Sequence, residues 1–481
     1  MGNALRRCSR VLSLVAPLGL AIGLIASPAA AQPAPPAAST ALAPAFPAGA
    51  AASVAAPAAP TIAAVLPPVA PSAPASPAAA PAVPAPRPAV TGAPALTPPA
   101  AVAPVKEPGI GDRVSSAVAW VEKMTGGWFE KIKLRGYTQS RYNRLGETND
   151  RLVNLQGDRS IGGDGGFLIR RARLIFFGDV HEHVSIYLQP DLASTAGDQA
   201  HVGILRDWYA DVFIDKRKEF RFRVGQSKVP YGFENMQSSQ NRLPFDRSDA
   251  LNSAVKDERD LGLFFYWAPE HIRARFKHLV DSGLKGSGDY GVVALGLYNG
   301  QTANQTEKND QPHVVARITW PFQIGNQIVE VGAGGYTGKF KVKKGDDVGG
   351  ADEFRDARVH ASFVLYPQPF GLQLEYNVGV GPELRGNQVQ ERVLHGGYAM
   401  AMLKIGPVTP YVRGVIYEGG RKFETNAPRY VIREIEGGVE WQVWKALEMT
   451  ASYNYAERTY PEPPYPQETG GFVRLQAQIN F

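Results

Sequence analysis

The sequence is poor in cysteine and in long apolar runs. Its single cysteine, Cys8, precedes the one long apolar run, in a part of the chain that export would remove. A mature chain without cysteine has no disulfide, no thiolate metal site and no cysteine nucleophile. A large fold must therefore hold the exported chain together.

The chain also lacks a large excess of charge of one sign. Its net charge is +6, and residues 1–31 contribute three arginines and no acidic residue, which leaves +3 for the mature chain. Because this balance is nearly neutral, bulk charge does not favour nucleic-acid binding. Any preference for anions has to come from the placement of individual charges.

Three segments precede the main domain. Residues 1–31 are predicted to be a secretory signal peptide, because arginines precede the apolar run and Ala29-Ala30-Ala31 offers a cleavage site. Residues 32–105 consist almost entirely of Ala, Pro, Val, Ser and Thr, which predicts a disordered linker. Residues 106–130 carry apolar positions at helical spacing and predict a short amphipathic helix.

Residues 131–481 contain no strand that is apolar on both faces, and their side chains alternate with a period of two. In the last strand Val473 and Leu475 lie on one face, and Arg474 and Gln476 lie on the other. A sandwich would have to bury or expose such mixed-charge faces, whereas a membrane barrel turns them toward a wet lumen. We therefore predict an all-β fold, a sixteen-stranded antiparallel transmembrane β-barrel without a dry protein core. The terminal Phe481 resembles the aromatic assembly signal of outer-membrane barrels.

Short and long links alternate between the expected strands, as they do when one rim faces the periplasm and the other faces the outside. An even count of sixteen strands places both termini at the short-turn rim. The segment 269–288 is interpreted as an unusually long turn, because a further strand at 272–277 would break the even count. The long links are predicted at 143–166, 227–259, 300–312, 338–356, 380–394, 419–431 and 457–471.

Six short stretches occur in the order found in a known family. They are LRGY at 134–137, IRRARL at 169–174, WYAD at 208–211, VGQSKVPYG at 224–232, ERDLG at 258–262 and LYNG at 297–300. Together they resemble the phosphate-selective porin O/P family. The resemblance implies a trimeric outer-membrane channel for small anions, with arginines and a lysine cluster along the pore. The Ala/Pro leader and the segment 269–288 lie outside the shared pattern.

Strand alternation turns many arginines toward the lumen, and the loop 227–259 is expected to fold inward and narrow it. Arginine can pass an anion between fork-shaped donors that hold it weakly enough for release. Three aspartates are predicted counter-charges, and if they pair with the arginines the wall is mixed and weakly selective: Asp191, Asp207 and Asp211. The candidate anion-binding residues are Arg135, Arg171, Arg173, Arg221, Arg223, Lys228, Arg242, Arg247, Arg259 and Arg317; Arg358 and Arg413 are also expected to point inward.

Signals for catalysis are missing from the sequence. The Gly-Xaa-Ser-Xaa-Gly pattern does not occur, and His181 and His183 are the only histidines near metal-ligand spacing. We therefore expect no enzyme, no metal and no cofactor.

The sequence predicts a passive outer-membrane porin for small, phosphate-like anions, exported by its signal peptide, embedded in lipid and homotrimeric. One alternative is a general diffusion porin with a mixed-charge lumen. Another is a barrel anchor that ties the membrane to the cell wall through the Ala/Pro arm.

Overall fold

The computed structural model describes residues 115–116, 119, 127–148, 166–196, 199–459 and 467–481. The predicted signal peptide and Ala/Pro linker lie outside these residues, as does most of the predicted helix at 106–130. Residues 115, 116 and 119 are helical, and a short 3-10 helix, η3 (Trp128–Lys131), precedes the first strand. No helix in the described ranges is long and apolar enough to cross a membrane.

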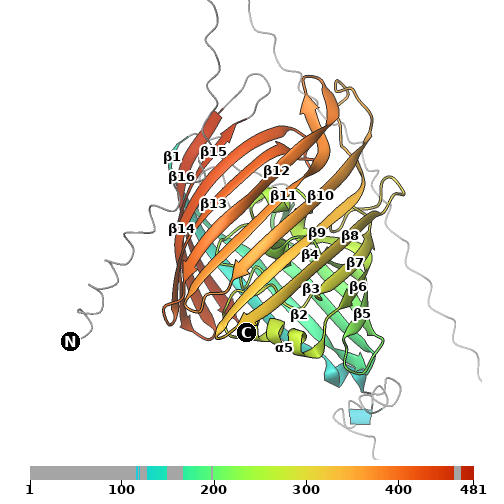
Figure 1. The fold of residues 1–481 in the computed structure, drawn as a ribbon, viewed down its shortest axis with the longest axis vertical. Coiled ribbons are helices and arrows are strands. Elements are labelled where there is room, and N and C mark those ends of the chain that lie inside the picture. The colour runs from blue at the N-terminus through green and yellow to red at the C-terminus, as the bar shows by residue number, and fades with distance from the viewer. Residues whose placement is uncertain (1–114, 117–118, 120–126, 149–165, 197–198, 460–466) are drawn as a thin grey trace, which may run out of the picture. The chain divides into compact units, whose positions relative to one another are not determined.

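The described chain forms a closed barrel of sixteen antiparallel strands, in which each strand pairs with its neighbours in sequence and β1 pairs with β16 (Figure 1). The predicted fold class and strand count are confirmed. The strands are β1 (Lys133–Thr148), β2 (Gly166–His181), β3 (Val184–Ala196), β4 (Gln199–Phe213), β5 (Phe220–Lys228), β6 (Arg259–Trp267), β7 (Val293–Tyr298), β8 (His313–Ile324), β9 (Gln327–Lys341), β10 (Glu353–Leu365), β11 (Phe370–Arg385), β12 (Gln388–Leu403), β13 (Val408–Gly420), β14 (Arg429–Trp444), β15 (Leu447–Thr459) and β16 (Gln467–Asn480).

The period-two pattern sets the two faces of the wall. Leu475 and Ile479 of β16 are about half exposed on the outside, whereas Arg474 and Gln478 are 1% exposed on the inside. An apolar exterior suits lipid, and ring closure pairs the backbone groups of every strand. The alternation thus places the charged residues where a solute would pass.

One predicted long link is wrong. The segment 380–394 continues as β11 and β12, and these strands are joined by the two-residue turn Gly386-Asn387. Gly386 has a φ of 59°, which a two-residue hairpin turn requires and which glycine adopts without steric cost. The strands therefore extend beyond the length that the alternation pattern predicted.

The segment after β6 is helical. Helix α5 (Glu270–Asp281) begins after Pro269 and ends before Gly283, whose φ of 63° closes the helix. Its buried residues Ile272, Phe276 and Leu279 follow helical spacing, and they pack beside Leu284, Val292 and Tyr366. The even strand count holds because the segment 269–288 adds no strand.

The segment between β5 and β6, residues 229–258, folds into the barrel, and we call it the lumen loop. It contains the short helices α3 (Phe233–Met236) and α4 (Asp249–Asn252) and the 3-10 turn η4 (Lys256–Glu258). Loop residues such as Tyr231, Leu251 and Val255 pack against inward-facing aromatic and aliphatic side chains of β6–β9 and β12–β14. The prediction that the interior has no dry core is wrong, because the lumen loop brings apolar side chains that cover these inner faces.

The two sides of the lumen therefore differ. We call the inner faces of β7–β12 the plugged half, because the lumen loop and α5 pack there in two apolar clusters that also include residues of β6, β13 and β14. We call the inner faces of β15, β16 and β1–β5 the cavity half, because they line an open cavity together with residues of β6, β13 and β14. One sector of the barrel is thus filled by the lumen loop, and the other keeps an open cavity.

Removal of Phe481 is expected to lower the free energy of unfolding by about 2 kcal/mol or more. Phe481 and Gly136 exchange two backbone hydrogen bonds, of 2.7 and 3.0 Å, where β1 meets β16, and each such bond contributes on the order of 1 kcal/mol. Denaturant unfolding in lipid vesicles, followed by tryptophan fluorescence, measures the change. The variant Phe481→Ala keeps the two backbone hydrogen bonds, so its free energy of unfolding should fall clearly less. An equal fall in both variants would show that these hydrogen bonds do not carry the effect. The role of Phe481 as an assembly signal remains a prediction.

Candidate functional site

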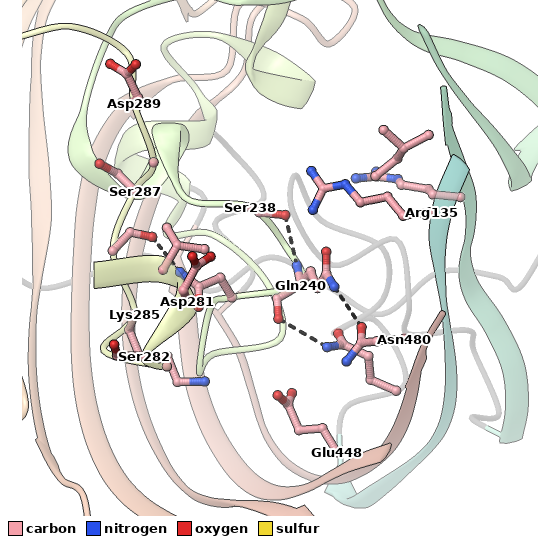
Figure 2. Close-up of a pocket in the computed structure, with 18 of the residues that line it drawn as sticks. Arg135, Ser238, Gln240, Asp281, Ser282, Lys285, Ser287, Asp289, Glu448 and Asn480 are labelled. Atoms are coloured by element: carbon pink, nitrogen blue, oxygen red, sulfur yellow. Dashed lines mark hydrogen bonds between the residues drawn. The ribbon is translucent and has the colours of Figure 1, made fainter. Parts of the chain in front are cut away.

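The cavity has a volume of about 740 Å³ and lies between the cavity half, the lumen loop and the residues that follow α5 (Figure 2). Arg135 reaches into it from β1, Gln240 from the lumen loop and Glu448 from β15. Hydrogen bonds hold the loop at this wall: Tyr137 and Ser239 share a 2.7 Å hydroxyl contact, and Gln240 donates to Asn480 at 2.8 Å. The lumen loop therefore narrows the lumen from one side.

Five of the ten predicted cations line this cavity, namely Arg135, Arg173, Arg223, Lys228 and Arg259, together with the predicted counter-charge Asp207. The other five do not line it. Arg221 is bound to Asp289, and Arg171 donates to Gln139 at 2.6 Å. Arg242 and Arg247 belong to the lumen loop, and Arg317 lies 3.6 Å from Glu330 in the plugged half. Arg358 and Arg413 point inward as expected, but they hold the lumen loop through Ser253 and Glu234.

The three predicted counter-charges each meet an arginine of the wall. Arg173 lies 2.8 Å from Asp191, Arg223 donates to both oxygens of Asp211 at 2.7 and 2.9 Å, and Arg259 lies 2.9 Å from Asp207. The first two pairs join neighbouring strands, and the third reaches from β6 across β5 to β4. All three leave little net charge of their own. Arg173, Arg223 and Arg259 therefore serve mainly to stabilise the barrel wall. Electrostatic attraction of an anion has to come from other cations.

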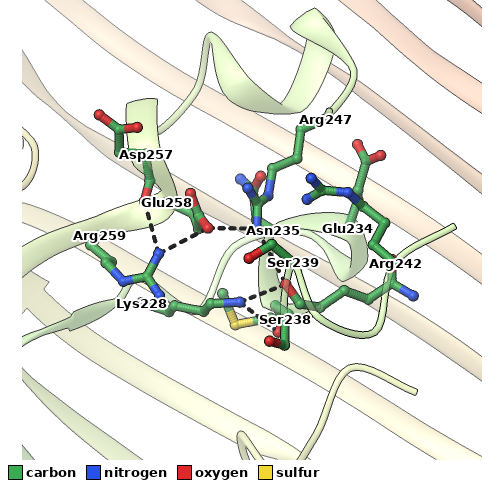
Figure 3. A network of polar contacts seen from close by, with 12 residues as sticks. Lys228, Glu234, Asn235, Ser238, Ser239, Arg242, Arg247, Asp257, Glu258 and Arg259 are labelled. Carbon is green, nitrogen blue, oxygen red and sulfur yellow. Dashed lines mark hydrogen bonds and ion pairs between the residues drawn. The ribbon is translucent and has the colours of Figure 1, made fainter. Parts of the chain in front are cut away.

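Cations without an acidic partner remain in the cavity. Among the described residues that line it, Arg135, Lys228, Lys404 and Lys445 form no ion pair. Lys228 is 4% exposed and donates to the carbonyl oxygens of Met236 and Gln237 at 2.9 and 2.7 Å (Figure 3). Among the described residues, Lys228 is therefore held by backbone carbonyl oxygens and not by an acidic side chain.

The carboxylates of the cavity are mostly neutralised. Asp207 pairs with Arg259, Asp281 with Lys277, Asp289 with Arg221 and Arg273, and Glu440 with Lys285. The described lining contains eight cationic and five anionic side chains. Two of these cations, Arg173 and Arg223, pair with Asp191 and Asp211, which lie outside the lining.

A charged network fixes the base of the lumen loop. Glu258 accepts hydrogen bonds from Arg259 at 2.9 Å and lies 2.5 Å from Arg247 (Figure 3). Burial opposes ionisation of Glu258, but the two arginines prevail and lower its pKa to about 2. The network stays ionised at neutral pH, and it holds the lumen loop in place beside Lys228.

Tyrosines complete the wall beside these charges. Tyr187 and Tyr209 face each other on β3 and β4 with ring centroids 5.0 Å apart, and the Arg223 guanidinium lies 3.7 Å from the Tyr209 centroid. Stacking of this kind fixes the planar guanidinium of Arg223. Lys285, Lys404, Glu440 and Glu448 were not among the predicted site residues. Strand parity places the two glutamates on inner faces, but no pattern in the sequence identifies the two lysines.

Substitution of Asp289 by Asn is expected to remove an acid-sensitive contribution to stability. Arg221 donates to Asp289 at 3.1 Å and Arg273 donates to it at 2.9 Å. Although burial opposes them, these arginines lower the pKa of Asp289 to about 2, whereas an unfolded aspartate titrates near ~4. Because the folded pKa is the lower one, the contribution of about 2 kcal/mol is present above pH ~4 and is lost as pH falls through 2.

Denaturant unfolding of the native protein and of Asp289→Asn, in pH steps from 7 to 2, measures this effect. The two curves should differ at pH 7 and converge near pH 2. Asp281→Asn is the matched control: its carboxylate is exposed on the same segment, so its loss should be within about 0.5 kcal/mol. A constant difference between the curves down to pH 2 would show that Asp289 does not act through its charge.

The comparisons with known proteins agree with a barrel of the porin type. The family model described as phosphate-selective porin O and P matches residues 149–351. No curated protein matches.

Among solved structures, the chain is similar to the outer membrane channel DcaP of Acinetobacter baumannii, with 14% identity, a TM-score of 0.48, and coverage of 73% of this chain and 97% of that one. It is also similar to an anion-selective porin from Comamonas acidovorans, with 9% identity, a TM-score of 0.44, and coverage of 73% and 99%. The family match confirms the resemblance that the sequence motifs predicted: this chain is an outer-membrane β-barrel channel protein that carries, in residues 149–351, the pattern of the phosphate-selective porin O and P family.

Proposed function

We propose that the protein is a passive channel that prefers small anions, such as phosphate, and conducts them through the cavity half of the lumen. The observation that carries the proposal is the set of cavity cations without acidic partners, Arg135, Lys228, Lys404 and Lys445, in a lining whose carboxylates are mostly paired. An anion that enters this field replaces part of its hydration shell with donors that hold it only loosely. The barrel needs no energy source for this and no chemical step.

The paired arginines favour a second candidate, a general diffusion channel with a mixed-charge lumen. Arg173, Arg223 and Arg259 each meet an aspartate, so the part of the wall that they form is nearly neutral. The two candidates differ in whether the four remaining cations dominate the field along the path of the solute. Selectivity therefore separates them, whereas conductance does not.

The reversal potential of the purified protein in a planar bilayer, under a tenfold KCl gradient, tests the proposal. An anion-selective potential, together with a fall in chloride conductance when inorganic phosphate is added, is the expected result. A potential near zero would favour the mixed-charge channel, and a cation-selective potential would overturn both candidates.

We further propose a homotrimer in the outer membrane, which the family resemblance implies, and export by the predicted signal peptide. A related arrangement is described for OmpT of Vibrio cholerae, one structure of which is a trimer form. Cross-linking in native membranes, read as a ladder of one to three subunits, tests the assembly. The alternative role as a cell-wall anchor depends on residues 32–105, and their deletion should leave conductance intact while weakening envelope attachment only if that role is real.

A further inference from the structure

The residues that follow α5 cross the lumen, and we call Ser282–Tyr290 the crossing segment. It follows α5, which begins shortly after β6, and it leads into β7, yet its Lys285 contacts Glu440 on β14. In the closed sequence of sixteen strands, β6 and β14 are eight strands apart, on opposite sides of the ring. A segment that leaves one wall and reaches the opposite wall has to span the bore.

Contacts along its whole length hold the crossing segment in place. Gln237 and Asn241 of the lumen loop donate to the carbonyl oxygens of Lys285 and Gly286, at 2.6 and 2.5 Å. At one end Lys404 donates to the carbonyl of Ser282 at 2.6 Å, and at the other end Arg221 donates to the carbonyl of Asp289 at 2.6 Å. The crossing segment and the lumen loop therefore bound the cavity together (Figure 2).

Lys285 is the charged group at the centre of this arrangement. Its Nζ lies 2.5 and 2.6 Å from the two oxygens of Glu440, and both residues are about 5% exposed. Glu448 lies beside them on the neighbouring strand, and both glutamates line the cavity. In the absence of Lys285, two carboxylates would face the water of the cavity that Arg135 and Lys228 also line.

We propose that Lys285 determines ion selectivity: carried across the bore by the crossing segment, it masks Glu440 and Glu448 and keeps the field of the cavity positive. The proposal rests on the proposed anion preference, but it concerns a single residue of the crossing segment. Lys285 touches no solute in this arrangement. It acts by screening the negative charge of two carboxylates that would otherwise face the path of the ions.

Reversal potentials of matched variants under a tenfold KCl gradient test the proposal. Lys285→Met should lower the chloride-to-potassium permeability ratio by about fivefold, because it removes a cation and exposes two carboxylates in a poorly hydrated space. Lys285→Arg should keep most of the native ratio. The double variant Lys285→Met with Glu440→Gln should regain at least half of the lost chloride-to-potassium permeability ratio, because it removes one of the exposed carboxylates.

Lys445→Met is the matched control, because it removes the same charge from an exposed position of the cavity lining without exposing a carboxylate. The chloride-to-potassium permeability ratio of Lys445→Met should fall less than half as far as that of Lys285→Met. Heat-modifiable electrophoretic mobility shows whether each variant folds, and Lys285→Arg keeps the test informative if Lys285→Met does not. The proposal is overturned if the Met variant shifts no further than Lys445→Met, or if the double variant gives no recovery.

The proposed function is judged separately. It depends on the sign of the native potential, whereas the role of Lys285 depends on the shift between variants. A cation-selective native channel whose Lys285→Met variant still moves fivefold toward potassium would overturn the anion preference and leave the role of Lys285 standing.

Discussion

Excision of residues 231–256, with Pro230 and Asp257 joined through an Asn-Gly turn, is expected to raise single-channel conductance roughly three- to tenfold, because the bore then approaches that of an unobstructed sixteen-stranded barrel. The join is geometrically possible, since Lys228 pairs with Arg259 and Val229 donates to the carbonyl of Glu258 at 3.0 Å. A two-residue turn can therefore close the hairpin.

The wall should survive this excision because its strand-to-strand hydrogen bonds do not involve the lumen loop. Arg358 and Arg413 would lose Ser253 and Glu234, but water would enter and solvate them. Arg413 also retains Glu436, 3.8 Å away. Single-channel recording in 1 M KCl measures the effect, with heat-modifiable mobility as the control for folding. An unchanged conductance in a folded variant would mean that the lumen loop does not limit flow.

The double substitution Arg135→Gln with Lys228→Gln is expected to lower the chloride-to-potassium permeability ratio by roughly fivefold or more. Both residues line the cavity without an acidic partner. No neighbouring carboxylate neutralises them, so they can act on the solute. Arg135 is exposed to the cavity, whereas Lys228 is buried beside the lumen loop, so the double substitution covers both environments.

A charge-matched control exists at the other end of the strands. Arg355 and Arg392 are exposed on β10 and β12 and do not line the cavity, so changing both to Gln removes the same net charge. Reversal potentials of the two double variants show whether selectivity depends on the cavity cations or on the overall charge of the barrel. If the control shifts selectivity as far as the cavity variant, the preference comes from overall charge and not from the cavity.

Strand alternation predicted the wall well, because a pleat has a fixed period and the barrel keeps each face in one environment. Parity correctly turned Arg173, Arg223 and Asp211 toward the lumen, and register brought them together. The same reasoning failed for α5. In Ile272-Arg273-Ala274-Arg275-Phe276-Lys277, apolar and basic residues alternate as in a strand, while Ile272, Phe276 and Leu279 also satisfy helical spacing.

The contents of the lumen were harder to predict for a different reason. Tyr231, Leu251 and Val255 lie in a loop without periodicity, and what they pack against depends on long-range topology. A dry cluster inside the barrel follows only when this loop turns inward. Lys285 was missed for the same reason: its partner Glu440 is 155 residues away in the chain, and only ring closure places the two on a common path.

The most direct test of the account is the reaction of single cysteines with a charged methanethiosulfonate reagent during channel recording. The chain has only Cys8, so Cys8→Ser provides a background without thiols. Tyr187→Cys places a thiol on the cavity half, and Val315→Cys places one at an inward position of the plugged half, where Val315 is 1% exposed. The account predicts that the reagent changes the conductance of the Tyr187→Cys channel and leaves that of Val315→Cys unchanged. A rapid change at Val315→Cys, with none at Tyr187→Cys, would show that ions cross the plugged half of the lumen.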